Sequence, residues 1–154
     1  MHPFTLSRPS VVLMTILSVS PFQSDHQFLG ETAGACKCQL ARSADLTGAL
    51  AVLNQCEVSV VLCEHDLMPG DWRDMLRCLL ERPRPPALIV TSRLADERLW
   101  AEALNLGAWD VLAKPFDRSE VICSIERAFQ HWYSSSSRQA AAPAGRMLEN
   151  PKSY

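Results

Sequence analysis

The chain has 154 residues, a formal net charge of −2 and 47% hydrophobic residues, which suits one globular domain with short flanking segments. This charge excludes a broad basic field that would attract nucleic acid, and no apolar run is long enough for a membrane-spanning helix. The six cysteines are expected to be reduced core thiols of a cytoplasmic protein, because most fall in apolar-periodic segments. Cys36 and Cys38 are expected on one face of a strand, but no second Cys/His pair is near them, and we predict no metal site.

Composition divides the chain into three parts. Residues 1–11 contain two prolines and no hydrophobic periodicity, so a flexible lead-in is expected. Residues 12–133 contain the apolar segments of one domain. Residues 134–154 begin with four serines and continue rich in Ala, Pro and Gly, which predicts a disordered tail. The apolar run at residues 11–19 resembles a short signal-peptide core, but Pro21 is poorly placed for cleavage, and we interpret the run as a strand.

The first half of the domain alternates predicted strands and helices. Residues 14–19 predict a strand, and Ser24 followed by Gln27 has the spacing of a helix-starting capping box. A short edge strand is expected at residues 37–42. Ser43 then predicts the cap of a second helix with its apolar residues on one face.

The central segment of the chain carries the strongest signal of a site. A buried, β-branched strand is predicted at residues 58–63. Three ionisable residues follow it directly: Glu64, His65 and Asp66. Turn residues come next, and Asp71 predicts the cap of an amphipathic helix. Open α/β sheets build sites at the C-terminal ends of their strands, so these side chains are candidates, although a merely solvated strand end has the same pattern.

Two further strands, expected at residues 87–90 and 109–113, also end on polar groups. These groups are Thr91 and Ser92 after the fourth strand, and Lys114 with Pro115 after the fifth. Asp96 suits the first turn of the helix between them, and Asp117 predicts the cap of the last helix. The whole pattern predicts a parallel sheet covered by helices on both faces. An acidic cluster, a hydroxyl and a lysine at three strand ends can then converge on one pocket.

Four motifs follow one another along the chain. They are Leu67-Met68-Pro69-Gly70 after strand three, Thr91 after strand four, Gly107-Ala108 before strand five, and Lys114-Pro115-Phe116 after it. With these motifs the chain from residue 14 to residue 132 resembles the receiver domain of two-component response regulators. The resemblance implies a flavodoxin-like, doubly wound (βα)5 fold with strand order 2-1-3-4-5.

The resemblance also implies a chemistry. In that family an aspartate ending strand three accepts a phosphoryl group, an acidic pair after strand one helps to hold Mg²⁺, and a hydroxyl and a lysine bind the phosphoryl group. The last two roles would fall to Thr91 and Lys114. The acidic pair aligns with Ser20 and Pro21, which supply no carboxylate, and Asp25 is too far along the chain to be assumed a substitute. We therefore predict no cofactor and expect Mg²⁺ binding to be lost or weak.

Two alignments that differ by one residue are possible for the phosphoacceptor position. Strand length selects Glu64, counting back from Pro69 selects His65, and neither count selects Asp66, the nearest aspartate. We expect a degenerate site in which Glu64 is a permanent anion opposite Lys114. A salt bridge that only stabilises the strand ends is the structural alternative.

The leading functional hypothesis is a non-enzymatic, single-domain pseudo-receiver that acts in phosphorelay signalling through protein contacts. Its expected partners are a histidine kinase or a downstream effector, and neither nucleic acid nor a membrane is expected. The sequence does not decide the oligomeric state, and a homodimer is one option. The resemblance places the partner surface around Trp100, Trp109 and Val111, of which Val111 has the position of the family's aromatic switch; core packing is favoured for Trp100. The alternatives are a working receiver phosphorylated by a histidine kinase at residues 64–66, and a flavodoxin-like small-molecule enzyme, which no Gly-rich phosphate loop supports.

Overall fold

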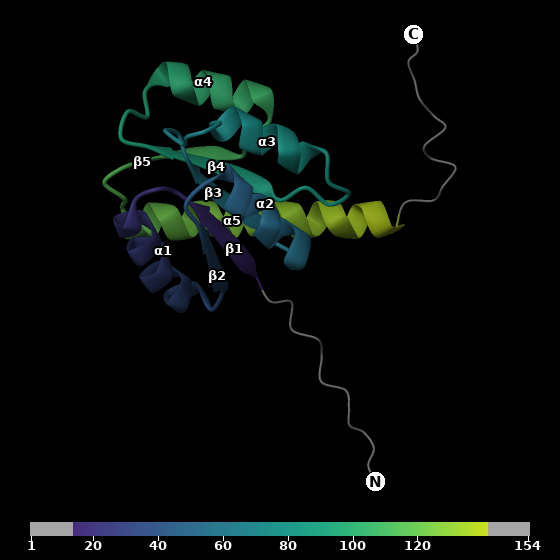
Figure 1. Ribbon diagram of the computed structural model, residues 1–154. Coiled ribbons are helices and arrows are strands. Elements are labelled where there is room, and N and C mark those ends of the chain that lie inside the picture. Colours follow the sequence, from purple (N-terminus) through teal and green to yellow (C-terminus); the bar gives the residue numbers. More distant parts are fainter. Residues whose placement is uncertain (1–13, 142–154) are drawn as a thin grey trace.

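A computed structural model describes residues 14–141, with side chains described for residues 14–135. Strands and helices alternate throughout this part of the chain (Figure 1). The strands are β1 (Thr15–Val19), β2 (Gln39–Ser43), β3 (Val60–Glu64), β4 (Ala87–Ser92) and β5 (Asp110–Ala113). The helices are α1 (Gln23–Cys36), α2 (Leu46–Gln55), α3 (Trp72–Leu80), α4 (Glu97–Leu106) and α5 (Arg118–Ala141). The predicted lead-in at residues 1–11 lies outside the described residues, as does the end of the predicted tail.

All five strands pair in parallel in the order β2-β1-β3-β4-β5. This order confirms the doubly wound, flavodoxin-like fold. Val19 pairs with Cys63, and Glu64 pairs with Thr91, so the C-terminal ends of β1, β3 and β4 lie side by side. The chain crosses from one side of β1 to the other between β2 and β3, which is where such sheets hold their sites.

Helices cover both faces of the sheet (Figure 1). Helices α1 and α5 pack on one face, with Leu29 and Ile125 in that core. Helices α2, α3 and α4 pack on the other face, where the ring of Trp72 is fully buried. Since both faces are covered, β3 and β4 are apolar along most of their length, and their ionisable and hydroxyl side chains lie at their C-terminal ends.

The start of α1 differs from the prediction. The sequence predicts Ser24 as the N-cap, but the helix begins at Gln23, its N-cap is Phe22, and no side chain caps it. Ser20, two residues before the cap, accepts a hydrogen bond from the Phe22 N–H at 3.0 Å. This hydroxyl fixes the turn before the helix, and the prediction of Ser24 is wrong because the organising group lies further upstream.

Helix α2 differs for the same reason. The predicted cap, Ser43, is wrong, because Asp45 accepts the capping hydrogen bond from the Gly48 N–H at 2.8 Å. Ser43 again lies two residues before the cap, and its hydroxyl donates to the Asp45 carbonyl oxygen at 2.7 Å. The predicted cap Asp71 is confirmed, whereas Asp96, which was expected in the first turn of its helix, is the N-cap of α4.

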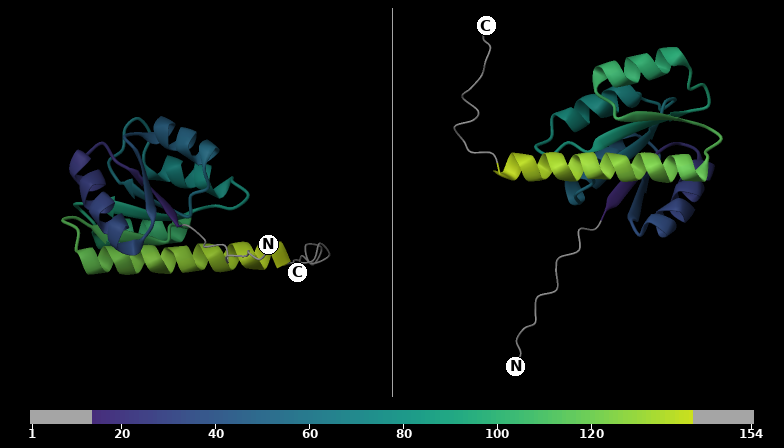
Figure 2. Two further views of the ribbon diagram at one scale, coloured as in Figure 1. Left: turned by 90° about the horizontal axis from the view of Figure 1, so that it is seen from below. Right: turned by 180° about the vertical axis from the view of Figure 1, so that it is seen from behind.

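Helix α5 is longer than expected. Residues 134–141, which the sequence analysis assigns to the tail, continue the helix to Ala141, past the packed part of the fold (Figure 2). The packed first turns have already nucleated this helix, so each further residue costs little, and Arg, Gln and Ala are good helix formers. No helix among residues 14–141 is long and apolar enough to cross a membrane.

The cysteines are free, as expected, but only Cys63 is buried. Cys56 and Cys123 are exposed, so the expectation that most of the thiols lie in the core is wrong. The expectation that Cys36 and Cys38 share a strand face is also wrong: Cys36 ends α1, and Cys38 lies in the turn before β2.

The two helical glycines Gly34 and Gly48 provide a matched test of local packing. A Cβ at Gly34 meets nothing within 4 Å, whereas one at Gly48 would lie 2.5 Å from the Ser43 hydroxyl. Gly34→Ala should therefore stabilise the protein by about 0.5–1 kcal/mol. Gly48→Ala should gain less or lose stability, because it disturbs the Ser43–Asp45 hydrogen bond, worth about 1 kcal/mol. Urea unfolding measures both variants, and an equal gain in both would contradict this packing.

Candidate functional site

A buried cluster of three charges lies at the C-terminal edge of the sheet. Lys114 directly follows β5, and its ammonium donates to Asp25 Oδ2 at 2.7 Å and forms an ion pair with Glu64 Oε1. The exposed fractions of these side chains are 8% for Lys114, 7% for Asp25 and 5% for Glu64. These two ion pairs therefore connect the end of β3, the end of β5 and the first turn of α1.

Each carboxylate in this cluster has a further donor. The Ser20 hydroxyl donates to Asp25 Oδ2 at 2.7 Å, and the backbone N–H of Asp66 donates to Glu64 Oε2 at 2.9 Å. The Phe22 ring lies over the ammonium of Lys114, with its centroid 4.9 Å from Nζ. With two carboxylates and one ammonium, the ionised cluster has one more negative charge than positive, and hydrogen bonds stabilise that excess.

A buried histidine positions Ser20. The His26 Nε2 lies 2.8 Å from the Ser20 carbonyl oxygen, and His26 Nδ1 lies 2.9 Å from the Ser18 hydroxyl. Since a carbonyl oxygen only accepts, Nε2 carries the proton, and in the neutral ring Nδ1 accepts from Ser18. The end of β1 and the start of α1 are thereby tied together directly behind Asp25.

The three candidates for the acceptor position lie in different environments. Glu64 is the last residue of β3 and points into the cluster. His65 is partly exposed, and Asp66 has 80% of its side chain exposed, with His65 Nδ1 3.7 Å from Asp66 Oδ1. Among the three, Glu64 is the residue whose carboxylate contacts Lys114.

The remaining predicted pocket residues line the same edge. Thr91 and Ser92 are buried at the end of β4, where the Thr91 carbonyl oxygen accepts from the His65 N–H at 2.8 Å. The Ser92 carbonyl oxygen accepts from the Lys114 N–H at 2.9 Å, and Pro115 follows across a cis peptide bond. These backbone contacts hold the ends of β3, β4 and β5 in register around the cluster.

Asp25 is the site residue that sequence reasoning missed. The predicted acidic-pair positions contribute only Ser20, which is buried against Asp25, while Pro21 is exposed. The first turn of α1 returns Asp25 toward the strand ends, so a residue that is distant along the chain lies in the pocket. The sequence signal for Asp25 was a carboxylate in the first turn of the helix after β1. This signal could be recognised only once the start of that helix was placed correctly.

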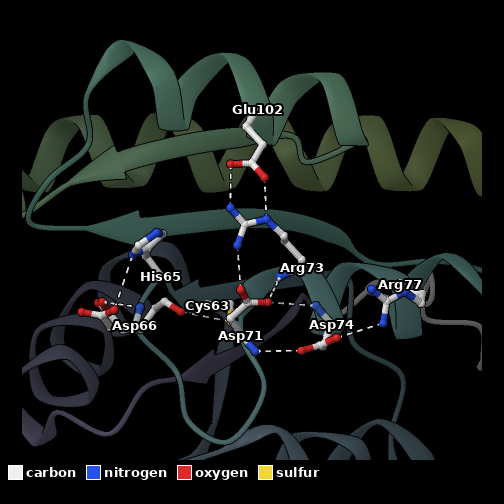
Figure 3. Close-up of polar contacts among 9 residues, drawn as sticks. Cys63, His65, Asp66, Asp71, Arg73, Asp74, Arg77 and Glu102 are labelled. Atoms are coloured by element: carbon white, nitrogen blue, oxygen red, sulfur yellow. Dashed lines mark hydrogen bonds and ion pairs between the residues drawn. The ribbon is translucent and has the colours of Figure 1, made fainter.

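A second charged contact lies beside the cluster and joins α3 to α4 (Figure 3). Arg73 binds both carboxylate oxygens of Glu102, with Nε to Oε2 at 2.5 Å and Nη2 to Oε1 at 2.7 Å. Its Nη1 also donates to Asp71 Oδ2, the N-cap of α3, at 2.7 Å. The hydrogen bond from Arg73 lowers the pKa of Glu102, so the bridge is fully ionised at neutral pH.

The residues predicted for a partner surface are unequally accessible. Trp100 is 40% exposed and lies one helical turn from the similarly exposed Leu104, because α4 turns Leu99 and Ala103 toward the core instead. The expectation that Trp100 packs in the core is therefore wrong. Val111 is only 2% exposed and belongs to the core rather than to a surface.

Trp109 lies at the other edge of the sheet. It is half-buried, and its ring stacks on His131 of α5 with centroids 4.6 Å apart. The predicted partner surface therefore reduces to the exposed face of α4 and a separate aromatic contact at the start of β5.

The two carboxylates of the cluster that could bind Mg²⁺ are already paired with a cation. Mg²⁺ needs near-octahedral oxygen ligands, yet Asp25 and Glu64 both bind the ammonium of Lys114. Their other contacts come from the hydroxyl of Ser20 and the N–H of Asp66. Among residues 14–141, no group of three or more His, Cys, Asp or Glu side chains is arranged to hold a metal ion. In this arrangement a metal ion has to displace the lysine.

Solved structures with the same fold include receiver domains. The signal receiver domain of an HD domain-containing protein from Pseudomonas fluorescens Pf-5 superposes with a TM-score of 0.76 at 27% identity, covering 86% of this chain and 99% of that one. The receiver domain of the Francisella response regulator 1452 superposes with a TM-score of 0.70 at 20% identity, covering 77% and 98%. The second similarity concerns the fold alone.

Sequence comparison gives the same class. The regulatory protein VirG of Rhizobium radiobacter is 32% identical over 87 residues, 56% of this chain. The DNA-binding transcriptional regulator NtrC of Proteus hauseri is 33% identical over 84 residues, 54% of this chain. The chain spans 33% of the length of that VirG and 18% of that NtrC. No family profile matches the chain.

The fold and the charged pocket define a regulatory α/β domain with its site at the C-terminal strand ends. With the similarities above, they give the described part of the chain the fold and the site position of a response-regulator receiver domain.

The charge balance of the cluster predicts an asymmetric response to mutation. Lys114→Met leaves Asp25 and Glu64 buried together without a cation, and should cost about 3–5 kcal/mol. Glu64→Gln leaves Asp25 and Lys114 as a balanced pair and should cost much less. Adding Glu64→Gln to Lys114→Met should restore part of the lost stability. Urea unfolding tests this, and equal losses in the two single variants would contradict a cluster with excess negative charge.

The Arg73 bridge predicts a local change in α4. Arg73→Ala should increase amide hydrogen exchange in α4 with little change in global stability, because the bridge is at the surface. Arg77→Ala is the matched control, since Arg77 binds only Asp74 within α3, at 2.9 Å. Because the pKa of Glu102 is lowered, the bridge is present above the ordinary glutamate pKa and is lost as the pH falls through the folded-state value. Equal exchange in both variants would show that the bridge does not hold α4.

Proposed function

We propose that this chain is a pseudo-receiver that signals through protein contacts, with a phosphorylation site that is degenerate. The observation that most strongly supports this proposal is the buried ion pair between Glu64 and Lys114. In a phosphate-accepting receiver the lysine binds the charge that phosphorylation adds, and that charge is transient. Here the carboxylate of Glu64 supplies a permanent negative charge to the same ammonium.

The surroundings of Glu64 support this proposal. Its second oxygen accepts the Asp66 N–H, so both carboxylate oxygens have partners before any phosphoryl donor arrives. Nucleophilic attack by Glu64 has to break the ion pair with Lys114. The magnesium ion that normally neutralises charge during phosphoryl transfer has to displace the same ammonium. Both requirements raise the barrier to transfer.

The proposed partner is a signalling protein, either a histidine kinase or a downstream effector, that docks on α4. Exposed apolar residues gather there: Trp100 and Leu104 lie on one face of α4, and Leu94, 78% exposed, lies in the loop before it. Scattered apolar residues are ordinary on a protein surface, but a tryptophan and a leucine one turn apart offer the anchor that helix-mediated interfaces use.

Acetyl phosphate with Mg²⁺, followed by intact mass measurement, tests the proposal. The expected result is no stoichiometric phosphoryl adduct on the native chain. Glu64→Asp restores the family's acceptor residue but leaves Ser20 and Pro21 in place, so it should also label poorly.

Two outcomes would contradict the proposal. An adduct lost in Asp66→Asn would show that the exposed aspartate accepts phosphate, and an adduct lost in Glu64→Gln would show that the buried glutamate does. His65→Asn is the control, since His65 lies between them without contacting Lys114. Either adduct would make the chain a working phosphate-accepting receiver.

A further inference from the structure

A cavity lies at the N-terminal edge of the sheet, opposite the charged cluster. It is placed where β4 and β5 begin, and its walls come from the end of α3, the loop before β4, the turn before β5 and the outer turns of α5. Its volume is about 250 Å³. An engineered apolar cavity of ~150 Å³ holds one benzene molecule, so this cavity has room for a ligand of one or two fused rings.

Three aromatic rings line the cavity, those of Trp109, His131 and Trp132. The ring of His131 stacks on that of Trp109 with centroids 4.6 Å apart. The side chain of Trp132 is 6% exposed, and its ring packs on Phe129 with centroids 5.9 Å apart. Because a neighbour already holds each ring, binding of a flat apolar molecule does not have to order the walls.

One hydrogen-bond donor at this cavity has no acceptor. The Nε1–H of Trp132 is buried, and it has no partner among the residues that the structure describes. A buried donor without a partner is unfavourable, and an indole nitrogen can only donate. A ligand beside Trp132 therefore gains affinity from an acceptor atom and not from a second donor.

Arg84 favours a negative charge on that acceptor. Its guanidinium carbon lies 4.4 Å from the centre of the Trp132 ring. Arg84 also pairs with Glu57, but Arg84 lines the cavity and Glu57 does not. Since one cation already lies over the indole, an incoming ammonium is repelled and has less of the ring to bind. A carboxylate is attracted to the guanidinium and accepts hydrogen bonds strongly.

We propose that this cavity binds a small, flat aromatic acid. The rings of the ligand pack against Trp109 and Trp132, and its carboxylate accepts the Trp132 Nε1–H beside Arg84. The site is separate from the charged cluster, so it does not depend on whether Glu64 accepts phosphate.

Titration of the native chain with 2-naphthoate, followed by NMR, tests the site. One saturable site with a Kd of about 1 mM or tighter is expected for a ligand of this size. Amide shifts should centre on residues 84–87, 107–109 and 131–135, and the indole N–H resonance of Trp132 should move downfield as it gains an acceptor. The cation 2-(aminomethyl)naphthalene has a similar shape and should bind at least about 10-fold more weakly.

Variants of α5 provide matched controls. Ser135→Phe places a ring in the cavity and should abolish saturable binding, whereas Ser134→Phe, one residue earlier and outside the cavity wall, should not. Trp132→Phe keeps an aromatic ring but removes the donor, so it should weaken 2-naphthoate binding by about 10-fold, the effect of one hydrogen bond. Thermal melting of each variant confirms that the fold is intact.

Three outcomes would overturn the proposal. They are the lack of a saturable site for 2-naphthoate, equal affinity for the acid and the amine, and equal effects of Ser134→Phe and Ser135→Phe. The two serine variants keep the test decisive if Trp132→Phe does not fold, because both serines are exposed.

Discussion

The burial of one lysine ammonium between two carboxylates is the constraint on which the rest of this structure depends. Lys114 follows β5, Glu64 ends β3 and Asp25 lies in α1, so three elements must stop at the same edge for the charges to meet. A buried charge without a partner costs several kcal/mol, so any register shift that separates them is strongly disfavoured. The cluster therefore selects the native strand ends as well as forming the site.

The strands and the position of Lys114 were predictable because they rest on short, local signals, whereas the order of the strands came from the resemblance to receiver domains. Apolar runs bounded by turn residues predict the strands, and alternation with helices predicts a parallel sheet. Glu64 was a candidate for the same reason, since it directly follows an apolar strand. These predictions need no knowledge of how distant side chains meet.

Asp25 was not predictable in this way, because its place in the pocket depends on where α1 begins. That start is fixed by the Ser20 hydroxyl and by His26 behind it, which are tertiary contacts rather than sequence patterns. The same limit explains α2, where Ser43 organises the turn and Asp45 caps the helix. The prediction of which side of α4 faces the core was wrong for a different reason. Trp100 fits the apolar spacing, but the helix turns the smaller residues beside it inward.

The two charged contacts of the site differ in how solvent reaches them. The Phe22 ring and the surrounding protein keep water and ions from Lys114, so added salt screens the pocket weakly. Arg73 and Glu102 are about 41% and 35% exposed, so their attraction falls as ionic strength rises. The attachment of α4 to α3 thus responds to the ionic composition of the surrounding solution more strongly than the buried pocket does.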